Sequence, residues 1–233
     1  MFNKEFEVTL HKASADQMKP KPDQSMLGFG QVFTDHMFTM RWNRQDGWHD
    51  AAIEPYANFS LDPAAMVFHY GQAIFEGMKA YRGKDDQIFL FRPADNFARM
   101  NQSALRICMP RFPQDRVLQA LRAMVYLDQE WVPGAPGATL YIRPTMIATE
   151  PALGLRPAEE YLFFIICCPV GAYYSEGFSP TRIYVEDKYV RAVPGGVGNA
   201  KTAGNYAASV RAQVEAHDRG YTQVLWLDAV ERR

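Results

Sequence analysis

Apolar residues along the chain follow two different spacings, which predict helices in some segments and strands in others. Over 115–130 the apolar positions fall three or four residues apart, as on one face of a helix. Tyr161–Cys168 is apolar at every position and short, which predicts a buried strand, and Ala138–Ile147 is expected to form another. Proline-glycine pairs at 133–134 and 136–137 separate the helix from these strands.

A hairpin is predicted around the polar turn Gly-Lys-Asp-Asp at 83–86. The flanking segments Gly77–Arg82 and Gln87–Arg92 alternate apolar and polar residues, as paired strands do. The first 60 residues are instead rich in turn formers and aromatic side chains, with short extended pieces such as Gln31–Arg41.

Capping residues predict two further helices, and a third is predicted to stop before Gly220. The Asp-Pro pair at 62–63 has the pattern of an N-cap followed by proline at the first helical position, so a short helix is expected through His69. Asp95 is expected to cap a helix that runs to about Ile107, and a third helix is expected over 206–218.

These elements divide into two predicted domains. An N-terminal domain is expected over 1–170, a connector over 171–181 and a second domain over 182–233. The second domain is expected to contain strands Arg182–Glu186 and Thr222–Leu227 around one helix. One helix and two or three strands are too few to close a core, so this domain is expected to be incomplete.

Composition narrows the class of protein. Hydrophobic residues make up 48% and charged residues 22% of the 233, which excludes wholesale disorder. A net charge of -1 favours neither nucleic acid nor an anionic membrane as a partner. The longest apolar run, 161–174, is interrupted by Pro169 and is shorter than the roughly 20 residues that a membrane-spanning helix needs.

Cysteine and histidine usage indicates the compartment and argues against a metal. Three cysteines make no disulfide framework, and the acidic N-terminus has no apolar stretch for a targeting signal, so a cytoplasmic location is expected. Five histidines are scattered without the spacing of metal ligands, so no metal site is predicted.

The segment Pro-Gly-Gly-Val-Gly-Asn-Ala-Lys-Thr at 194–202 contains the most informative lysine. It matches a nucleotide-binding P-loop except that Ala200 replaces the glycine before Lys201. A lysine in small apolar surroundings also suits imine formation with an aldehyde, and Tyr206 is close enough in sequence to bind a phenolate-type oxygen. From spacing alone, a solvated loop lysine is the favoured interpretation.

Six segments, in order along the chain, resemble branched-chain amino acid aminotransferases, which are pyridoxal-phosphate enzymes of fold type IV. The resemblance runs in register from about Gly28 to Asp228. The segments are FTDHM (33–37), FEGMKAYRG (75–83), LFRP (90–93), YIRPTMIATEPALG (141–154), CPVGAYY (168–174) and VGNAKTAGNY (197–206). The resemblance implies a two-domain α/β (α+β) fold of type IV, and it is what rejects the solvated interpretation of Lys201.

The resemblance also implies the cofactor-binding residues. Lys201 would bind pyridoxal 5'-phosphate covalently and act as the general base and acid. Tyr206 would bind the ring oxygen of the cofactor, and Arg99 would hold its phosphate. Arg92 and Arg106 are expected to form surface ion pairs instead.

Candidate substrate-binding residues lie mainly in the N-terminal domain. Tyr141 and Arg143 alternate on one strand, so both point to one face, where they would organise a substrate carboxylate. In relatives of this kind the tyrosine lines the substrate pocket. An apolar pocket for leucine, isoleucine and valine side chains would be completed by Phe29, Tyr70 and Phe75, with Leu153 and Leu155 reaching in from the second subunit of a homodimer.

The implied reaction is reversible transfer of the amino group of leucine, isoleucine or valine to 2-oxoglutarate, as in branched-chain amino acid biosynthesis. Relatives continue beyond the position of Arg233, and the further segment carries an acidic partner for the pyridine nitrogen. We therefore expect a truncated chain with weak cofactor binding and poor turnover. Alternatives are a catalytically silent subunit, D-amino acid transamination, aminodeoxychorismate lyase chemistry or, more distantly, nucleotide binding.

Overall fold

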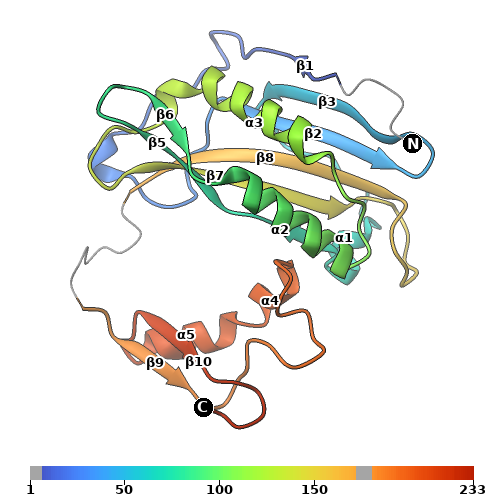
Figure 1. Ribbon diagram of the computed structural model, residues 1–233, viewed down its shortest axis with the longest axis vertical. Coiled ribbons are helices and arrows are strands. Elements are labelled where there is room, and N and C mark those ends of the chain that lie inside the picture. Colours follow the sequence, from blue (N-terminus) through green and yellow to red (C-terminus); the bar gives the residue numbers. More distant parts are fainter. Residues whose placement is uncertain (1–6, 172–179) are drawn as a thin grey trace.

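A computed structural model describes residues 7–171 and 180–233 of the chain, and its main feature is an eight-stranded sheet (Figure 1). The strands follow the order β1-β3-β2-β8-β7-β5-β6, and β4 pairs with β7 beside β5. Their bounds are β1 Thr9–Leu10, β2 His36–Asn43, β3 Gly47–Pro55, β4 Ala73–Phe75, β5 Met78–Arg82, β6 Ile88–Leu90, β7 Thr139–Ala148 and β8 Glu160–Val170.

Two helices of 14 residues each, α2 (Pro93–Arg106) and α3 (Gln114–Leu127), cover one face of this sheet (Figure 1). Helix α1 (Met66–Tyr70) and the short 3-10 turns η1 (Gln24–Met26) and η2 (Gln129–Trp131) complete this part. None of the helices in the described ranges is long and apolar enough to cross a bilayer.

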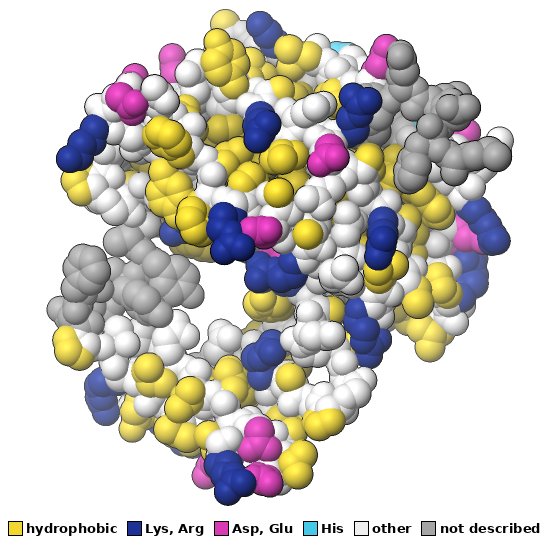
Figure 2. All heavy atoms as spheres, in the orientation of Figure 1, with side chains coloured by type: hydrophobic (Ala, Val, Ile, Leu, Met, Phe, Trp, Pro, Cys, Tyr) yellow, Lys and Arg dark blue, Asp and Glu magenta, His cyan; other side chains and the backbone are white. Residues whose placement is uncertain are grey.

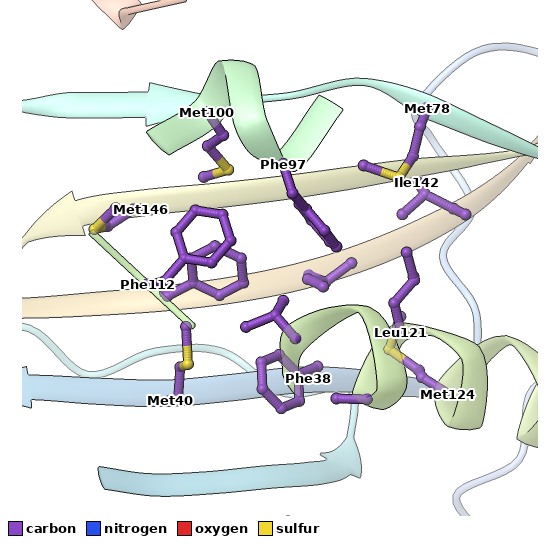
Figure 3. Close-up of a cluster of buried hydrophobic side chains, with 14 of the residues drawn as sticks. Phe38, Met40, Met78, Phe97, Met100, Phe112, Leu121, Met124, Ile142 and Met146 are labelled. Atoms are coloured by element: carbon purple, nitrogen blue, oxygen red, sulfur yellow. The ribbon is translucent and has the colours of Figure 1, made fainter. Parts of the chain in front are cut away.

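The core lies between the helices and the sheet and is rich in methionine and phenylalanine (Figure 3). Strand β7 shows how the sequence assigns its two faces: Leu140, Ile142 and Met146 are buried in this core. The alternate residues Tyr141 and Arg143 are half-buried on the opposite face, as the two-residue period of a strand requires. Because one face of β7 is buried in the core, only residues on its other face, such as Tyr141 and Arg143, are available to form a site.

The predicted hairpin is confirmed, with β5 and β6 paired across the 83–87 turn, and β7 and β8 lie where two strands were predicted. The short strands β1 and β4 were not predicted. The extended piece predicted over 31–41 is β2, but its partner β3 was not predicted. A turn closed by Asn43, whose Oδ1 accepts from the backbone N of Asp46 at 2.7 Å, connects the two strands. Gly47 follows with φ +68°, a conformation that glycine adopts at little cost.

Helix starts in the N-terminal part differ from the prediction. Helix α1 begins at Met66 and not at Pro63, because Ala65 is held extended in a bridge with Pro151. Asp95 does not cap α2: that helix begins at Pro93, and Asp95 lies in its first turn.

The helix predicted over 206–218 is two helices, α4 (Ala203–Ala207) and α5 (Val210–Asp218). The break lies at Ser209, whose hydroxyl donates to the carbonyl of Tyr206 at 2.8 Å and so competes with the regular helical pattern.

The C-terminal part pairs β9 (Ile183–Glu186) in parallel with β10 (Gln223–Trp226), with α4 and α5 between them in sequence (Figure 1). Thr202 joins this part to the large sheet: it forms a bridge with Ile74, and its hydroxyl donates to the carbonyl of Ala73 at 2.9 Å. Most of the predicted connector lies outside the described residues, and the division into domains stays a prediction.

Asp35 anchors the segment that precedes β2. Its buried carboxylate accepts from the backbone N of Lys19 at 2.8 Å, from Lys21 Nζ at 3.0 Å and from Trp131 Nε1 at 2.7 Å. Both ends of the segment 19–35 therefore meet at one side chain, and Phe29 lies between them, 5.0 Å from the Tyr141 ring.

Asp35→Asn is expected to lower the free energy of unfolding by about 2 kcal/mol at pH 7, because it weakens charge-assisted hydrogen bonds to a buried group. Burial alone would raise the pKa of Asp35, but the bonds from Lys19, Trp131 and Lys21 outweigh it and hold that pKa below its usual value. The stabilisation is therefore present above about pH 4 and is lost as the pH falls through the lowered pKa.

Denaturant unfolding of both proteins at pH 7 and pH 3 checks this, with the exposed Asp187→Asn as control. We expect the difference between wild type and Asp35→Asn to shrink at pH 3. An equal difference at both values would contradict the account.

Candidate functional site

The glycine-rich loop before Lys201 presents its carbonyl groups to two polar side chains. Arg106 Nη2 donates to the carbonyls of Gly195 at 3.2 Å and Gly196 at 3.1 Å. Asn205 Nδ2 donates to the carbonyls of Val197 at 2.8 Å and Ala200 at 2.7 Å. Carbonyl oxygens directed at donors in this way fix the loop's shape, whereas a phosphate-binding loop presents N–H groups.

Arg92, which precedes helix α2, and the two α2 arginines Arg99 and Arg106 thus have different partners. The ion pair predicted for Arg92 is confirmed, since its Nε lies 2.6 Å from Asp95 Oδ2. The ion pair predicted for Arg106 is wrong: this residue is committed to the glycine-rich loop. Arg99 is paired with a buried carboxylate, described below.

Lys201 is held at its backbone and leaves its amine beside two aromatic side chains. Its N–H donates to Ser103 Oγ at 2.8 Å, and its carbonyl accepts from the backbone N of Phe75 at 3.1 Å. Nζ is hydrogen-bonded to the Tyr206 hydroxyl and lies 4.6 Å from the centroid of the Phe75 ring. The amine therefore lies against an aromatic wall, beside a hydroxyl that can orient it for attack on an aldehyde.

Tyr141 and Arg143 continue this surface along β7. Arg143 Nη2 donates to the Tyr141 hydroxyl at 2.9 Å, and the guanidinium carbon lies 4.6 Å from the Phe75 ring centroid. Arg143 Nε is buried and has no partner among the described residues. A Cβ at Gly77 would collide with the Tyr141 hydroxyl, so only glycine leaves room for the tyrosine.

Arg99 forms a bidentate ion pair with Glu76. Arg99 Nε lies 2.6 Å from Glu76 Oε1, and Nη2 lies 2.7 Å from Oε2. The hydrogen bonds that Arg99 donates to Glu76, together with the charge of that carboxylate, raise the pKa of Arg99 against the opposing effect of burial. Lys and Arg side chains gather on this face where the two parts meet (Figure 2), which favours an anionic ligand.

Six of the predicted site residues therefore form one continuous set of contacts. These are Phe29, Phe75, Tyr141, Arg143, Lys201 and Tyr206. Arg99 joins them through Glu76, the residue after Phe75.

The other three predicted substrate-binding residues, Tyr70, Leu153 and Leu155, lie outside this set of contacts. The Tyr70 hydroxyl donates to the carbonyl of Leu153, and the structure gives none of the three a contact with Lys201 within the described ranges. Leu153 and Leu155 are 67% and 85% exposed.

Sequence reasoning missed Glu76, Ser103 and Asn205. Glu76 belongs to the Phe-Glu-Gly segment, in which only the phenylalanine was assigned a role. An acidic residue inserted between apolar strand positions was the available signal. Ser103 lies on the same helix as Arg99, one turn further on, and nothing in its local sequence marks it as the partner of a residue 98 positions away.

The side chains present fit an aldehyde-bearing aromatic cofactor with an anionic group. An amine, a phenol and a guanidinium supply the three donors, and the Phe75 ring supplies an apolar surface. Within the residues that the structure describes, no group of three or more histidine, cysteine or acidic side chains converges as metal ligands do.

Comparisons with known proteins find relatives that share one name. Two Bacillus subtilis (strain 168) proteins named as branched-chain-amino-acid aminotransferase 2 and transaminase 1 are 54% and 56% identical to this chain. Each alignment covers 92% of this chain, and 59% and 61% of the respective relatives. The chain thus spans about 60% of the length of these curated relatives. They confirm the resemblance found in the sequence.

Solved structures of the same kind share the fold. The branched-chain aminotransferase of Thermoproteus uzoniensis with norvaline aligns with a TM-score of 0.65 at 24% identity, over 83% of this chain and 60% of that one. The branched-chain amino acid aminotransferase of Thermobaculum terrenum in its pyridoxal-phosphate form gives 0.64 at 21% identity, over 85% and 60%. These likenesses confirm the mixed α/β fold.

The broadest match is to a family. Residues 73–231 fit the sequence model described as amino-transferase class IV, a range that includes Phe75, Arg99, Tyr141, Lys201 and Tyr206. Because the match extends over well more than half of the chain, the chain belongs to the class IV aminotransferase family.

Proposed function

We propose that this chain carries a pyridoxal-phosphate-dependent transaminase site for branched-chain amino acids, with 2-oxoglutarate as the amino acceptor. The observation that carries the proposal is the placement of the Lys201 amine against Tyr206 and Phe75. Relatives named as branched-chain aminotransferases, at 54% and 56% identity, support the substrate class.

The cofactor supplies an electron sink when bound. Lys201 is the residue that would hold it covalently, Tyr206 would donate to its ring oxygen, and Arg99 would bind its phosphate. During turnover, Lys201 Nζ would take up the proton released from the substrate Cα and donate it to the cofactor. The Tyr206 hydroxyl at Nζ holds the amine in reach of that carbon, and the Phe75 ring limits the access of water.

The opposite end of the contact set would bind the substrate. Arg143 and the Tyr141 hydroxyl bind a carboxylate, and the rings of Phe29 and Phe75 surround an aliphatic side chain. Such walls recognise shape, and one methylene changes binding by only about 1–3 kcal/mol. Leucine, isoleucine and valine should therefore all be accepted.

The assembly proposed is a homodimer, in which Leu153 and Leu155 of one copy reach the site of the other. Their exposure in the single chain supports this arrangement. A cytoplasmic location is proposed from the three cysteines, all of which are free thiols.

A substrate panel tests the proposal. The chain, supplied with pyridoxal phosphate and 2-oxoglutarate, should form glutamate from L-leucine, L-isoleucine and L-valine. Turnover of D-alanine or of aminodeoxychorismate instead would support a sister activity. No turnover of any of them, with the cofactor unbound, would support a catalytically silent subunit.

Arg143→Met is expected to raise KM for the amino acid by about tenfold or more, since a hydrogen bond to a charged group contributes about 1.5–3 kcal/mol. The value of kcat should fall much less, because the methionine keeps the apolar contact with Phe75 while Lys201 is unchanged. Steady-state kinetics with L-leucine checks this, with the exposed Arg122→Met as control. A lower kcat at unchanged KM would contradict the assigned role.

A further inference from the structure

The carboxylate of Glu76 is wholly buried at 0% exposure and is surrounded by donors. Arg99 Nε and Nη2 contact it at 2.6 and 2.7 Å, Asn96 Nδ2 at 3.1 Å and the backbone N of Gly77 at 3.2 Å. A buried polar group needs such partners, and these four hydrogen bonds hold the Glu76 carboxylate in one position in the fold.

The strand geometry explains why the carboxylate points to helix α2. Phe75 and Gly77 lie on the side of the site, where they contact Lys201 and Tyr141. Glu76 between them points to the opposite side, as neighbouring residues in extended backbone do. Its own backbone N donates to the carbonyl of Pro144 at 2.9 Å, which fixes it to the large sheet.

The Arg99 guanidinium is paired with Glu76 on one side and faces a cavity on the other. Glu76 occupies two of the five N–H groups of the guanidinium, and the remaining groups have no partner among the described residues. The side chain is 57% exposed and lines a cavity of about 510 Å³, to which Lys79 and Tyr141 also contribute.

We propose that Glu76 is a positioning residue for anion binding: it fixes the Arg99 guanidinium so that its outward N–H groups bind the phosphate of the cofactor. The inference rests on the proposed function and deepens it. Arg99 touches the phosphate, whereas Glu76 acts only through Arg99.

Glu76 has two opposing effects on the affinity of Arg99 for a phosphate, and this makes the proposal testable. As an anion, Glu76 reduces the positive potential that a phosphate experiences at Arg99. As a fixed partner, it keeps a long flexible side chain in one orientation, so that no rotamer freedom is lost on binding. The bidentate geometry and complete burial of the carboxylate favour the second effect.

Equilibrium binding of pyridoxal phosphate and of pyridoxal, which lacks the phosphate, measures this without turnover. Wild type should prefer the phosphorylated compound, and Glu76→Gln should lose that preference by about tenfold or more, with pyridoxal affinity unchanged. In either orientation of the amide, its NH2 group faces an N–H group of Arg99, so glutamine cannot replace the bidentate acceptor.

Glu215→Gln is the matched control, since Glu215 pairs with Arg211 at 2.6 Å on the surface of α5, away from the cavity. It should keep the wild-type preference. Far-UV circular dichroism and Tm of each variant show whether it is folded.

Arg99→Lys gives a second, independent readout, because lysine keeps the charge but cannot form the bidentate pair. The proposal expects it to lose the phosphate preference about as much as Glu76→Gln does. A Glu76→Gln protein that keeps or strengthens the preference overturns the proposal, as does Arg99→Lys with wild-type preference. If the wild-type protein binds pyridoxal phosphate no more tightly than pyridoxal, both the proposed function and this inference are contradicted.

Discussion

Lys201→Ala is expected to reduce transamination by more than about 10³-fold, because it removes both the nucleophile for the cofactor and the group that moves the substrate proton. Glutamate formation from L-leucine, measured with the chain and saturating pyridoxal phosphate, checks this. Adding a small alkylamine to the variant should restore part of the rate, since it supplies the missing base.

The fold should survive this substitution. Lys201 is held through its backbone, by Ser103 Oγ at 2.8 Å and the N–H of Phe75 at 3.1 Å, and alanine keeps both contacts. Lys84→Ala, in the exposed hairpin turn, is the control and should retain full activity. A Lys201→Ala protein with a wild-type rate would show that the chemistry lies elsewhere.

Phe163→Ala is expected to lower the free energy of unfolding by about 3–5 kcal/mol. Phe163 is 0% exposed, and its ring lies 4.9 Å from Phe112, 6.2 Å from Phe38 and 6.3 Å from Trp48. Removing it opens a cavity where β2, β3, β8 and the segment between the two helices meet. A loss of this size is a large part of the roughly 5–15 kcal/mol that stabilises a typical protein.

The neighbouring residue provides the control. Phe164 points to the other face of β8, is half-buried and contacts Phe59 at 5.0 Å between ring centroids. Phe164→Ala should therefore cost distinctly less, about 1–2 kcal/mol. Equal losses for the two variants in urea unfolding would contradict the placement of the core on one face of the sheet.

Elements whose signal is local were predictable from the sequence. The apolar run that forms β8, the helical spacing of α3 and the turn between β5 and β6 each lie within one short stretch of chain. The start of α1 was not predictable, because Ala65 is held extended by Pro151, far along the chain. The pairing of β3 was missed although Ala51 and Ile53 are buried on alternate positions, since a short alternation is a weak signal.

The site residues also divide into those with a local signal in the sequence and those that depend on distant parts of the chain. The glycine-rich loop singled out Lys201, but only the family resemblance gave it a role in preference to a solvated lysine. Glu76 escaped notice because its partner Arg99 is 23 positions away, and the two meet only when α2 packs on the sheet. Arg106 was misassigned for the same reason, since the carbonyls that it binds are 89 and 90 positions away.

The most direct test of the central claim is to identify the lysine that captures the cofactor. The chain is mixed with pyridoxal phosphate, its visible absorption spectrum is recorded, and the complex is reduced with borohydride and mapped by peptide mass spectrometry. We predict a reducible absorption band and the added cofactor mass on Lys201. An absent band with Lys201 unmodified, or a label spread over surface lysines, would contradict the account.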